Sequence, residues 1–179
     1  MRAALLIIDM LNDFVSGPMA CEAAKVVLPK IRHLLEVARS KKLPVIYICD
    51  AHYPGVDAEL RLWGPHALVG TKGAEVVDEL KPAEGEYVIK KRRYSGFFET
   101  DLDLLLRELK VKRLVLTGLD TSICVRHTAA DAFFRGYSLV VPRDAVTTWE
   151  PTDNEPALKY LKEIYGAEIL TTEDLASQL

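Results

Sequence analysis

Short apolar runs rich in β-branched residues alternate along this chain with longer stretches that carry the apolar spacing of helices. The runs are almost continuously apolar, as expected of strands buried on both faces of a parallel sheet. Helices between strands at this spacing are typical of βαβ crossovers, which place helices on both faces of the sheet. The chain is therefore predicted to be an α/β protein with a parallel sheet between two helical layers.

The expected elements follow from the apolar runs, the turn residues and the helix-capping patterns. Strands are predicted over residues 3–8, 44–49, 86–90, 113–117, 138–141 and 167–170. Helices are predicted over residues 21–41, 74–80, 100–109, 121–135 and 155–165, with a short one at the C-terminus. Residues 100–103 (TDLD) are interpreted as a capping box. No repeat, low-complexity tract or linker divides the series, so residues 1–179 are interpreted as one domain.

Charge and composition argue against several classes of protein. The formal net charge is −3, whereas a protein that binds nucleic acid through phosphates normally carries a basic surplus. No apolar run is long enough to cross a bilayer, and the N-terminus lacks the arrangement of a signal peptide. Cys21, Cys49 and Cys124 are an odd number at unrelated spacings, so we expect free thiols and a cytoplasmic location.

Reactive side chains follow the carboxyl ends of four predicted strands, which is where open α/β sheets bind ligands. Asp9 follows the first strand and Asp50 the second. Lys91 follows the third, and Cys124 lies beyond the turn after the fourth. Each has an ordinary alternative, as a turn cap, a solvated lysine in a basic run or a small apolar core residue. Their meeting at one edge favours a catalytic site made of Asp9, Lys91 and Cys124.

Cys124 is expected in the first turn of a helix, because residues 120–122 (DTS) form a capping-type stretch before it. The unpaired N–H groups and the dipole of a helix N-terminus favour a thiolate, and the same N–H groups can hold an oxyanion. A nearby lysine lowers the pKa of a thiol further, and a carboxylate can accept its proton. We therefore expect Cys124 to be an acidic nucleophile. Cys21 and Cys49 lack such neighbours and are expected to be structural.

A second constellation combines Asp50 and His52 with His66, which lies in a long loop. An Asp-x-His pair at the end of a strand can turn two ligand atoms toward one point, and a later His can complete a three-ligand metal site. The alternative is a pair of surface histidines in a mobile loop. A long loop in a compact domain is more often functional than idle, so the metal site remains under consideration.

Four segments in order resemble the isochorismatase-like cysteine hydrolase superfamily, which includes nicotinamidases and N-carbamoylsarcosine amidases. They are residues 5–14 (LLIIDMLNDF), 91–103 (KRRYSGFFETDLD), 118–137 (GLDTSICVRHTAADAFFRGY) and 143–146 (RDAV). The resemblance implies a three-layer Rossmann-like fold with a six-stranded parallel sheet in the order 3-2-1-4-5-6 and helices on both faces. In that order the first and fourth strands are neighbours, which brings Asp9 beside Cys124.

The same resemblance implies roles for individual residues. The catalytic aspartate, lysine and cysteine of the family match Asp9, Lys91 and Cys124, with Lys90 as a rival one residue out of register. Family members carry a cis peptide bond shortly before the nucleophile, which here matches the bond that precedes Asp120. The oxyanion hole would then consist of the backbone N–H groups of Asp120 and Cys124.

Nicotinamidases bind a divalent metal through an Asp-x-His pair and a distal His, and a Trp three residues before that His lines the ring pocket. Asp50, His52 and His66 match these metal ligands, and zinc is the expected ion. Trp63 matches the pocket tryptophan, and Phe14 is expected to stack on the ring with it. No organic cofactor is expected.

The sequence departs from the nicotinamidase pattern at two places, so an N-carbamoylsarcosine amidase-like enzyme is retained as an alternative. Residues 54–59 (PGVDAE) contain no His where some nicotinamidases have one, and Asp120 stands where a small or uncharged side chain is usual. A carboxylate there could raise the pKa of the thiol or bind substrate N–H groups. Residues 118–132 most resemble archaeal proteins grouped with N-carbamoylsarcosine amidase. Arg126 could hold a substrate carboxylate or be an exposed helix arginine.

The expected function is hydrolysis of a small amide through a thioester with release of ammonia, most nearly that of a nicotinamidase. One alternative is an N-carbamoylsarcosine amidase-like ureido hydrolase that requires no metal. Another is a catalytically idle, metal-stabilised interaction module, in which iodoacetamide would find no cysteine with a lowered pKa. A dinucleotide-binding domain is disfavoured because no Gly-x-Gly-x-x-Gly follows the first strand. Family members usually form dimers or tetramers, so a homo-oligomer is expected.

Overall fold

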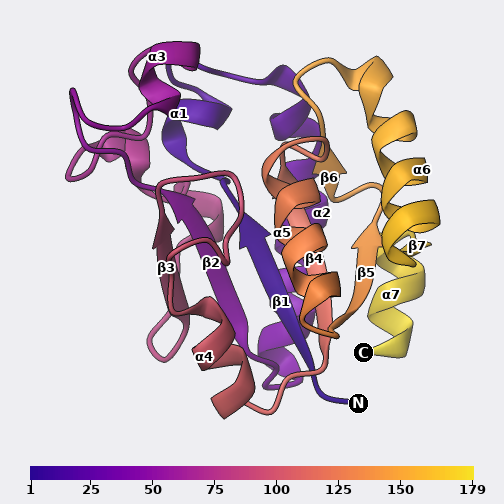
Figure 1. Ribbon diagram of the computed structural model, residues 1–179. Helices are drawn as coiled ribbons and strands as arrows, with labels where there is room; N and C mark the ends of the chain where they lie inside the picture. The colour runs from indigo at the N-terminus through magenta and orange to yellow at the C-terminus, as the bar shows by residue number, and fades with distance from the viewer.

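The computed structural model describes all 179 residues and contains one sheet between two layers of helices (Figure 1). The strands are β1 (Ala3–Ile8), β2 (Val45–Asp50), β3 (Tyr87–Lys91), β4 (Arg113–Leu119), β5 (Ser138–Pro142), β6 (Val146–Thr147) and β7 (Glu168–Leu170). All pair in parallel, in the order β3-β2-β1-β4-β5-β7. The predicted α/β class and strand order are confirmed. The sheet has seven strands rather than six, because the two-residue β6 also pairs with β4.

The two faces of the sheet bury alternate residues of the same strand. All six residues of β1 are buried. Leu5 and Ile7 belong to one apolar cluster, whereas Leu6 and Ile8 belong to the other. Successive strand side chains point to opposite faces, so a strand covered on both sides must be apolar at every position. This is the physical reason for the continuous apolar runs in the sequence.

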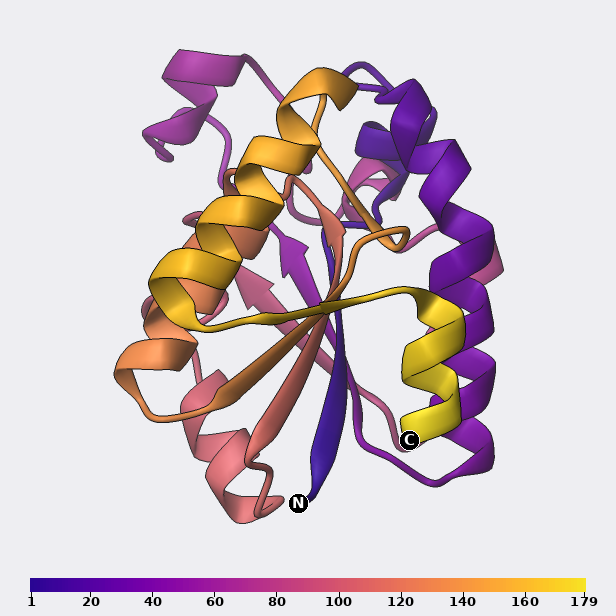
Figure 2. The same ribbon diagram turned by 90° about the vertical axis from the view of Figure 1, so that its right-hand side faces the viewer.

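Helices cover both faces of the sheet, as Figure 2 shows in a view along its edge. One face carries α1 (Asn12–Val15), α2 (Glu22–Ser40) and α7 (Thr172–Gln178). The other carries α4 (Leu102–Glu108), α5 (Cys124–Phe134) and α6 (Asn154–Tyr165). Short elements complete the chain, namely α3 (Glu59–Trp63) and the 3-10 helices η1 (Lys72–Ala74), η2 (Asp78–Leu80) and η3 (Pro151–Asp153). None of the helices combines the length and apolarity needed to span a membrane.

The helix predicted over residues 74–80 is wrong. Two 3-10 turns, η1 and η2, flank an extended stretch there, and Val76 forms an antiparallel bridge with Leu11. The Val77 N–H donates to the carbonyl of Met10, and the Asn12 N–H donates to the carbonyl of Glu75. Pairing with the chain just after β1 uses the backbone groups that a helix would need, so the tertiary contact outweighs the local pattern.

Two predicted helix starts differ in detail. Helix α5 begins at Cys124 rather than at residue 121, because residues 121–123 form a turn around Asp120. Helix α4 begins after Asp101 without the reciprocal bonds of a capping box. The Asp103 carboxylate accepts a hydrogen bond from the Tyr137 hydroxyl instead. Because α5 starts at Cys124, the thiol lies at the very first helical position.

Candidate active site

The carboxyl ends of the four strands on the β3 side of the sheet bring the predicted catalytic residues to one edge. Asp9 directly follows β1, and Asp50 is the last residue of β2. Lys91 ends β3 and is paired in register with Asp50, while Cys124 opens α5 just beyond β4. Parallel pairing of β1 with both β2 and β4 places these ends side by side. Each residue is at least nine-tenths buried.

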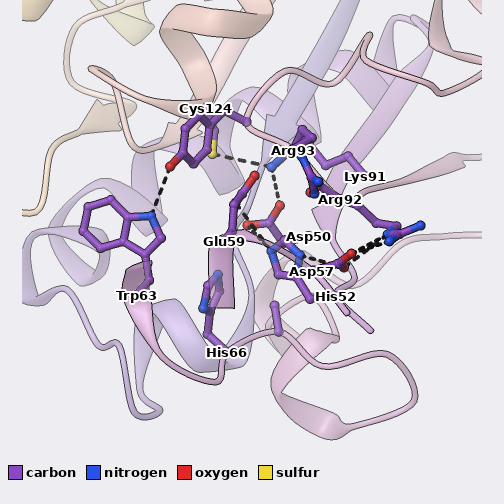
Figure 3. Close-up of polar contacts among 12 residues, drawn as sticks. Asp50, His52, Asp57, Glu59, Trp63, His66, Lys91, Arg92, Arg93 and Cys124 are labelled. Atoms are coloured by element: carbon purple, nitrogen blue, oxygen red, sulfur yellow. Dashed lines mark hydrogen bonds and ion pairs between the residues drawn. The ribbon is translucent and has the colours of Figure 1, made fainter. Parts of the chain in front are cut away.

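Lys91 contacts the other three side chains of this cluster, and Figure 3 shows its contacts with Asp50 and Cys124. Its Nζ atom is 2.5 Å from Asp50 Oδ1, 2.9 Å from Asp9 Oδ2 and 3.4 Å from Cys124 Sγ. An ammonium group has three protons to donate, and three partners surround it here. The neighbouring Lys90 is exposed, because successive strand side chains point to opposite sides. The structure therefore brings Lys91, and not its rival, to Asp9 and Cys124.

Burial controls the ionisation of this cluster. Burial and the charge of Asp50 raise the pKa of Asp9 to about 6, against the attraction of Lys91. Burial raises the pKa of Cys124 well above its usual value. The charges of Asp9 and Asp50 raise it further, and the charge of Lys91 only partly offsets these effects. Burial works against the charge of Lys91, but the two carboxylates still raise its pKa. The predicted acidic thiol is therefore wrong, since one lysine does not outweigh burial and two carboxylates.

Two backbone N–H groups in the segment that leads into α5 have no hydrogen-bond partner. The peptide bond between Leu119 and Asp120 is cis. The N–H groups of Asp120 and Cys124 donate no hydrogen bond within the protein, whereas those of Ser122 and Val125 both bond to Asp120. Asp120 and Cys124 both line the same cavity. Free N–H groups at a helix start are suited to hold a negatively charged oxygen.

The Asp120 carboxylate is used inside the protein. Its Oδ1 accepts hydrogen bonds from the N–H and the hydroxyl of Ser122, at 2.7 and 2.6 Å. Its Oδ2 accepts one from the Trp149 N–H at 2.9 Å. The side chain therefore holds the turn before the thiol and the loop that carries Trp149. These three bonds account for an acidic residue at this position without a role in binding substrate.

A cavity of about 100 Å³ opens over the thiol. The predicted Phe14 and Trp63 line it, and the Trp63 indole N–H donates to the Tyr94 hydroxyl at 3.2 Å (Figure 3). Phe14 packs edge-on against Trp149, with ring centroids 5.5 Å apart. The remaining apolar lining residues, which sequence reasoning missed, are Met19, Tyr94, Leu119, Ile123 and Trp149. They come from separate loops and strand ends, so no local pattern links them.

The predicted metal ligands meet at one point and are joined by a fourth residue. Asp50, His52 and His66 are buried, and Glu59 from α3 joins them. One ligand atom from each of the four residues lies within 4.8 Å of those of the others. Glu59 was not predicted, because the nicotinamidase pattern places a histidine in this stretch and residues 54–59 contain none. An acidic residue in that stretch was the available signal, since carboxylates also bind metals.

Unpaired atoms in this cluster fit a divalent cation. His52 Nε2 and Glu59 Oε1 are buried without a hydrogen-bond partner. His52 Nε2 lies 3.7 Å from Asp50 Oδ2 and 3.6 Å from Glu59 Oε2, which is too far for good hydrogen bonds. Burial and the charge of Asp50 raise the pKa of Glu59 to about 7. Mixed imidazole and carboxylate donors suit zinc and related ions, which would satisfy these atoms.

Arg126 takes no part in the cavity. Its guanidinium lies 3.7 Å from the centroid of the Tyr160 ring, and it is absent from the cavity lining. Cys21 and Cys49 are buried in the core, and neither lines this cavity. The structure therefore supplies no arginine to hold a substrate carboxylate beside Cys124.

Comparison with known proteins matches residues 3–174 to the isochorismatase domain. The N-carbamoylsarcosine amidase from Thermoplasma acidophilum is 42% identical, over 97% of this chain and 98% of that chain, with a TM-score of 0.91. Nicotinamidase PncA from Bacillus subtilis is 36% identical, over 95% and 99%, with a TM-score of 0.90. The pyrazinamidase of Pyrococcus horikoshii, solved in complex with zinc, is 30% identical over 96% and 99%, with a TM-score of 0.87. The chain therefore belongs to the isochorismatase family.

Proposed function

We propose that the protein is a cysteine amidohydrolase that cleaves the C–N bond of a small planar aromatic amide and releases ammonia, as a nicotinamidase does. The observation that carries this proposal is the Cys124 sulfur, 3.4 Å from Lys91 Nζ, beneath a small cavity with aromatic walls. The amidases among its relatives support hydrolysis of a C–N bond. Phe14 and Trp63 line the same cavity as Cys124, which supports a flat aromatic ring as the part of the substrate bound next to the reacting amide.

In the proposed reaction, the Cys124 sulfur attacks the amide carbonyl as its proton passes to Asp9. Lys91 stabilises the developing thiolate, and the N–H groups of Asp120 and Cys124 hold the oxyanion. Asp9 then gives the proton to the departing ammonia, leaving a thioester on Cys124. Asp9 next takes a proton from the water that attacks the thioester, and returns this proton to the departing Cys124 sulfur, so that the acid and the free thiol are released. Because the resting thiol has a raised pKa, proton transfer and attack are expected to occur together.

Asp50, His52, Glu59 and His66 would hold a divalent cation beside the cavity, and zinc is our proposed ion. When bound, the ion would supply a Lewis acid for a ring nitrogen or a water molecule. Asp50 also accepts a hydrogen bond from Lys91, so one carboxylate joins the two clusters. The proposed metal site and the proposed nucleophile therefore share a wall of the cavity.

An N-carbamoylsarcosine amidase-like activity is the second candidate, because the relative from Thermoplasma acidophilum is 42% identical. A carbamoyl amino acid carries a carboxylate, which normally requires a cation in its binding site. Lys91 is the only cationic side chain at the thiol, and two carboxylates already pair with it. Arg126 lies outside the cavity. These observations favour a neutral aromatic amide.

Ammonia release will distinguish the two substrates. With zinc-loaded protein, we expect kcat/KM for nicotinamide to exceed that for N-carbamoylsarcosine by at least about 100-fold, because no arginine lines the cavity and Lys91 is already paired with two carboxylates. The measurement is a coupled assay of ammonia with each compound, and Cys124→Ala provides the background. The reverse preference would establish the second candidate. Turnover of neither compound would favour the idle interaction module.

The pH profile will test Asp9 as the base. We expect kcat/KM to rise with pH through an apparent pKa near 6, the value to which burial raises the pKa of Asp9. Below this pH the protonated carboxyl cannot accept the thiol proton, so the rate should fall about tenfold per pH unit. The apparent pKa belongs to the coupled group of Asp9, Lys91 and Cys124. Initial rates across the acidic range measure it, and a rate that stays constant there would remove Asp9 from this role.

We further propose that the protein works in the cytoplasm as a homo-oligomer. Its three cysteines are free thiols, which suits a reducing compartment. Phe133 and Phe134 on α5 and Ile164 on α6 are exposed large apolar side chains. A second copy of the chain that covered them would remove this apolar surface from water.

A further inference from the structure

We propose that Asp57, clamped by Arg92, is the positioning residue of the metal-binding cluster. In this role it holds the His52 ring so that the unprotonated Nε2 faces the cluster. The inference rests on the metal site proposed above and assigns a function to two residues outside the ligand set. His52 has no exposed surface, and its two ring nitrogens differ in their surroundings.

Only one nitrogen of His52 has a partner. Its Nδ1 lies 3.2 Å from Asp57 Oδ2, whereas Nε2 has no hydrogen-bond partner. The same Asp57 oxygen accepts a hydrogen bond from the Tyr53 N–H at 2.8 Å, which fixes the carboxylate relative to the backbone. Histidines that bind metals commonly donate their other N–H to a carboxylate, which sets the tautomer and the ring orientation. His52 and Asp57 have this arrangement.

Arg92 makes Asp57 an acceptor. Its Nε atom donates to Asp57 Oδ1 at 2.8 Å and to Oδ2 at 3.1 Å, and its Nη2 also donates to Oδ1 (Figure 3). A guanidinium fork of this kind pairs with an ionised carboxylate, which can only accept hydrogen bonds. Nδ1 of His52 must then carry the proton. In a neutral ring this leaves the lone pair on Nε2, which is the form that a metal ligand requires.

The clamp also sets the position of α3. Asp57 lies two residues before Glu59 and is buried, whereas Arg92 follows Lys91 at the end of β3. The Arg92 guanidinium lies 4.8 Å from the centroid of the Tyr53 ring as well, so it contacts this segment twice. One ion pair therefore ties the chain that carries Glu59 to the strand that carries Lys91, while it orients His52.

Zinc binding by the full chain tests this role. We expect Asp57→Asn to weaken zinc binding about 10- to 100-fold in competition with a chelator, because a neutral amide neither retains Arg92 nor fixes the Nδ1 proton. Arg92→Gln should weaken binding in the same direction, and Arg92→Lys should restore part of it. The matched control is Arg113→Gln, which breaks the ion pair with Glu168 at the opposite end of the sheet and should leave zinc affinity unchanged.

A spectroscopic measurement separates orientation from general loosening of the fold. The nitrogen chemical shifts of the His52 ring should report a proton on Nδ1 in the metal-free native protein and a mixture of tautomers in Asp57→Asn. Native zinc affinity and native ring shifts in both Asp57→Asn and Arg92→Gln would overturn the clamp alone. Failure of the native chain to bind zinc would overturn the proposed metal site and the clamp together. The ammonia assay with nicotinamide would still test the proposed amidohydrolase activity independently.

Discussion

Cys124→Ala is expected to lower kcat for ammonia release at least about 10³-fold while the protein stays folded. The side chain that this substitution removes carries the sulfur 3.4 Å from Lys91 Nζ, and no other cysteine lines the cavity. Lys91 keeps its contacts with Asp9 and Asp50, so no buried charge loses its partner. The free energy of unfolding should therefore change by no more than about 1 kcal/mol.

Cys21→Ala is the matched control for this substitution. Cys21 is also a buried thiol, but it lies in the core and its sulfur contacts the carbonyl of Thr148 at 3.7 Å. Its removal should leave kcat within about twofold, because it touches no group of the proposed reaction. A thioester trapped by acid quench and seen by mass spectrometry should occur on Cys124 in the native protein. Unchanged turnover by Cys124→Ala would refute the proposed chemistry.

Gly118→Ala is expected to destabilise the fold by at least about 4 kcal/mol. Gly118 lies in β4 opposite Ile8 of β1, and its φ of +104° is a conformation that other residues rarely adopt. A Cβ atom there would lie 2.0 Å from the carbonyl oxygen of Ile8. Both are backbone positions in the middle of the sheet, so neither can move without separating β1 from β4. That close approach also brings Asp9 next to the turn that begins at Asp120.

Gly136→Ala is the control for the conformational part of this effect. Gly136 has a φ of +80°, and nothing lies within 4 Å of a Cβ atom added there. This substitution should cost only about 1 kcal/mol, because it pays for the left-handed backbone but meets no clash. Urea unfolding of both variants measures the difference. Equal destabilisation by the two substitutions would contradict the argument from close approach.

The strands and most long helices could be predicted because local patterns specify them. Both faces of the sheet are covered, so each central strand is apolar throughout, and α2 buries Val27, Ile31 and Leu34 on one side. The neighbouring positions of β1 and β4 rested on family resemblance, whereas the placement of Asp9 and Cys124 at one edge of the sheet was expected from the strand ends as well. The strands and helices could be predicted from short stretches of sequence, and the strand order from matching family motifs.

The segment between β2 and β3 was largely missed, because contacts with distant residues determine its form. The Asp13 carboxylate accepts the Ala67 N–H at 2.8 Å, and the Asn12 amide donates to the carbonyl of Lys72 at 2.9 Å. Glu59 reaches the metal cluster from the short helix α3 in the same segment. Short helices with few repeating apolar positions leave little periodic signal, so their place depends on such long-range bonds.

Ionisation at the site most clearly separates what the sequence determines from what the tertiary structure determines. The sequence alone predicted that the reactive side chains after the strands lie together, since the carboxyl ends of parallel strands meet at one edge of a sheet. Which atoms gain or lose protons was not, because a pKa depends on burial and on charges brought close by folding. Burial, with Asp9 and Asp50 adding to it, raises the pKa of Cys124, whereas a lowered pKa was expected. The identities of the reacting groups are thus local properties, whereas their protonation belongs to the packed protein.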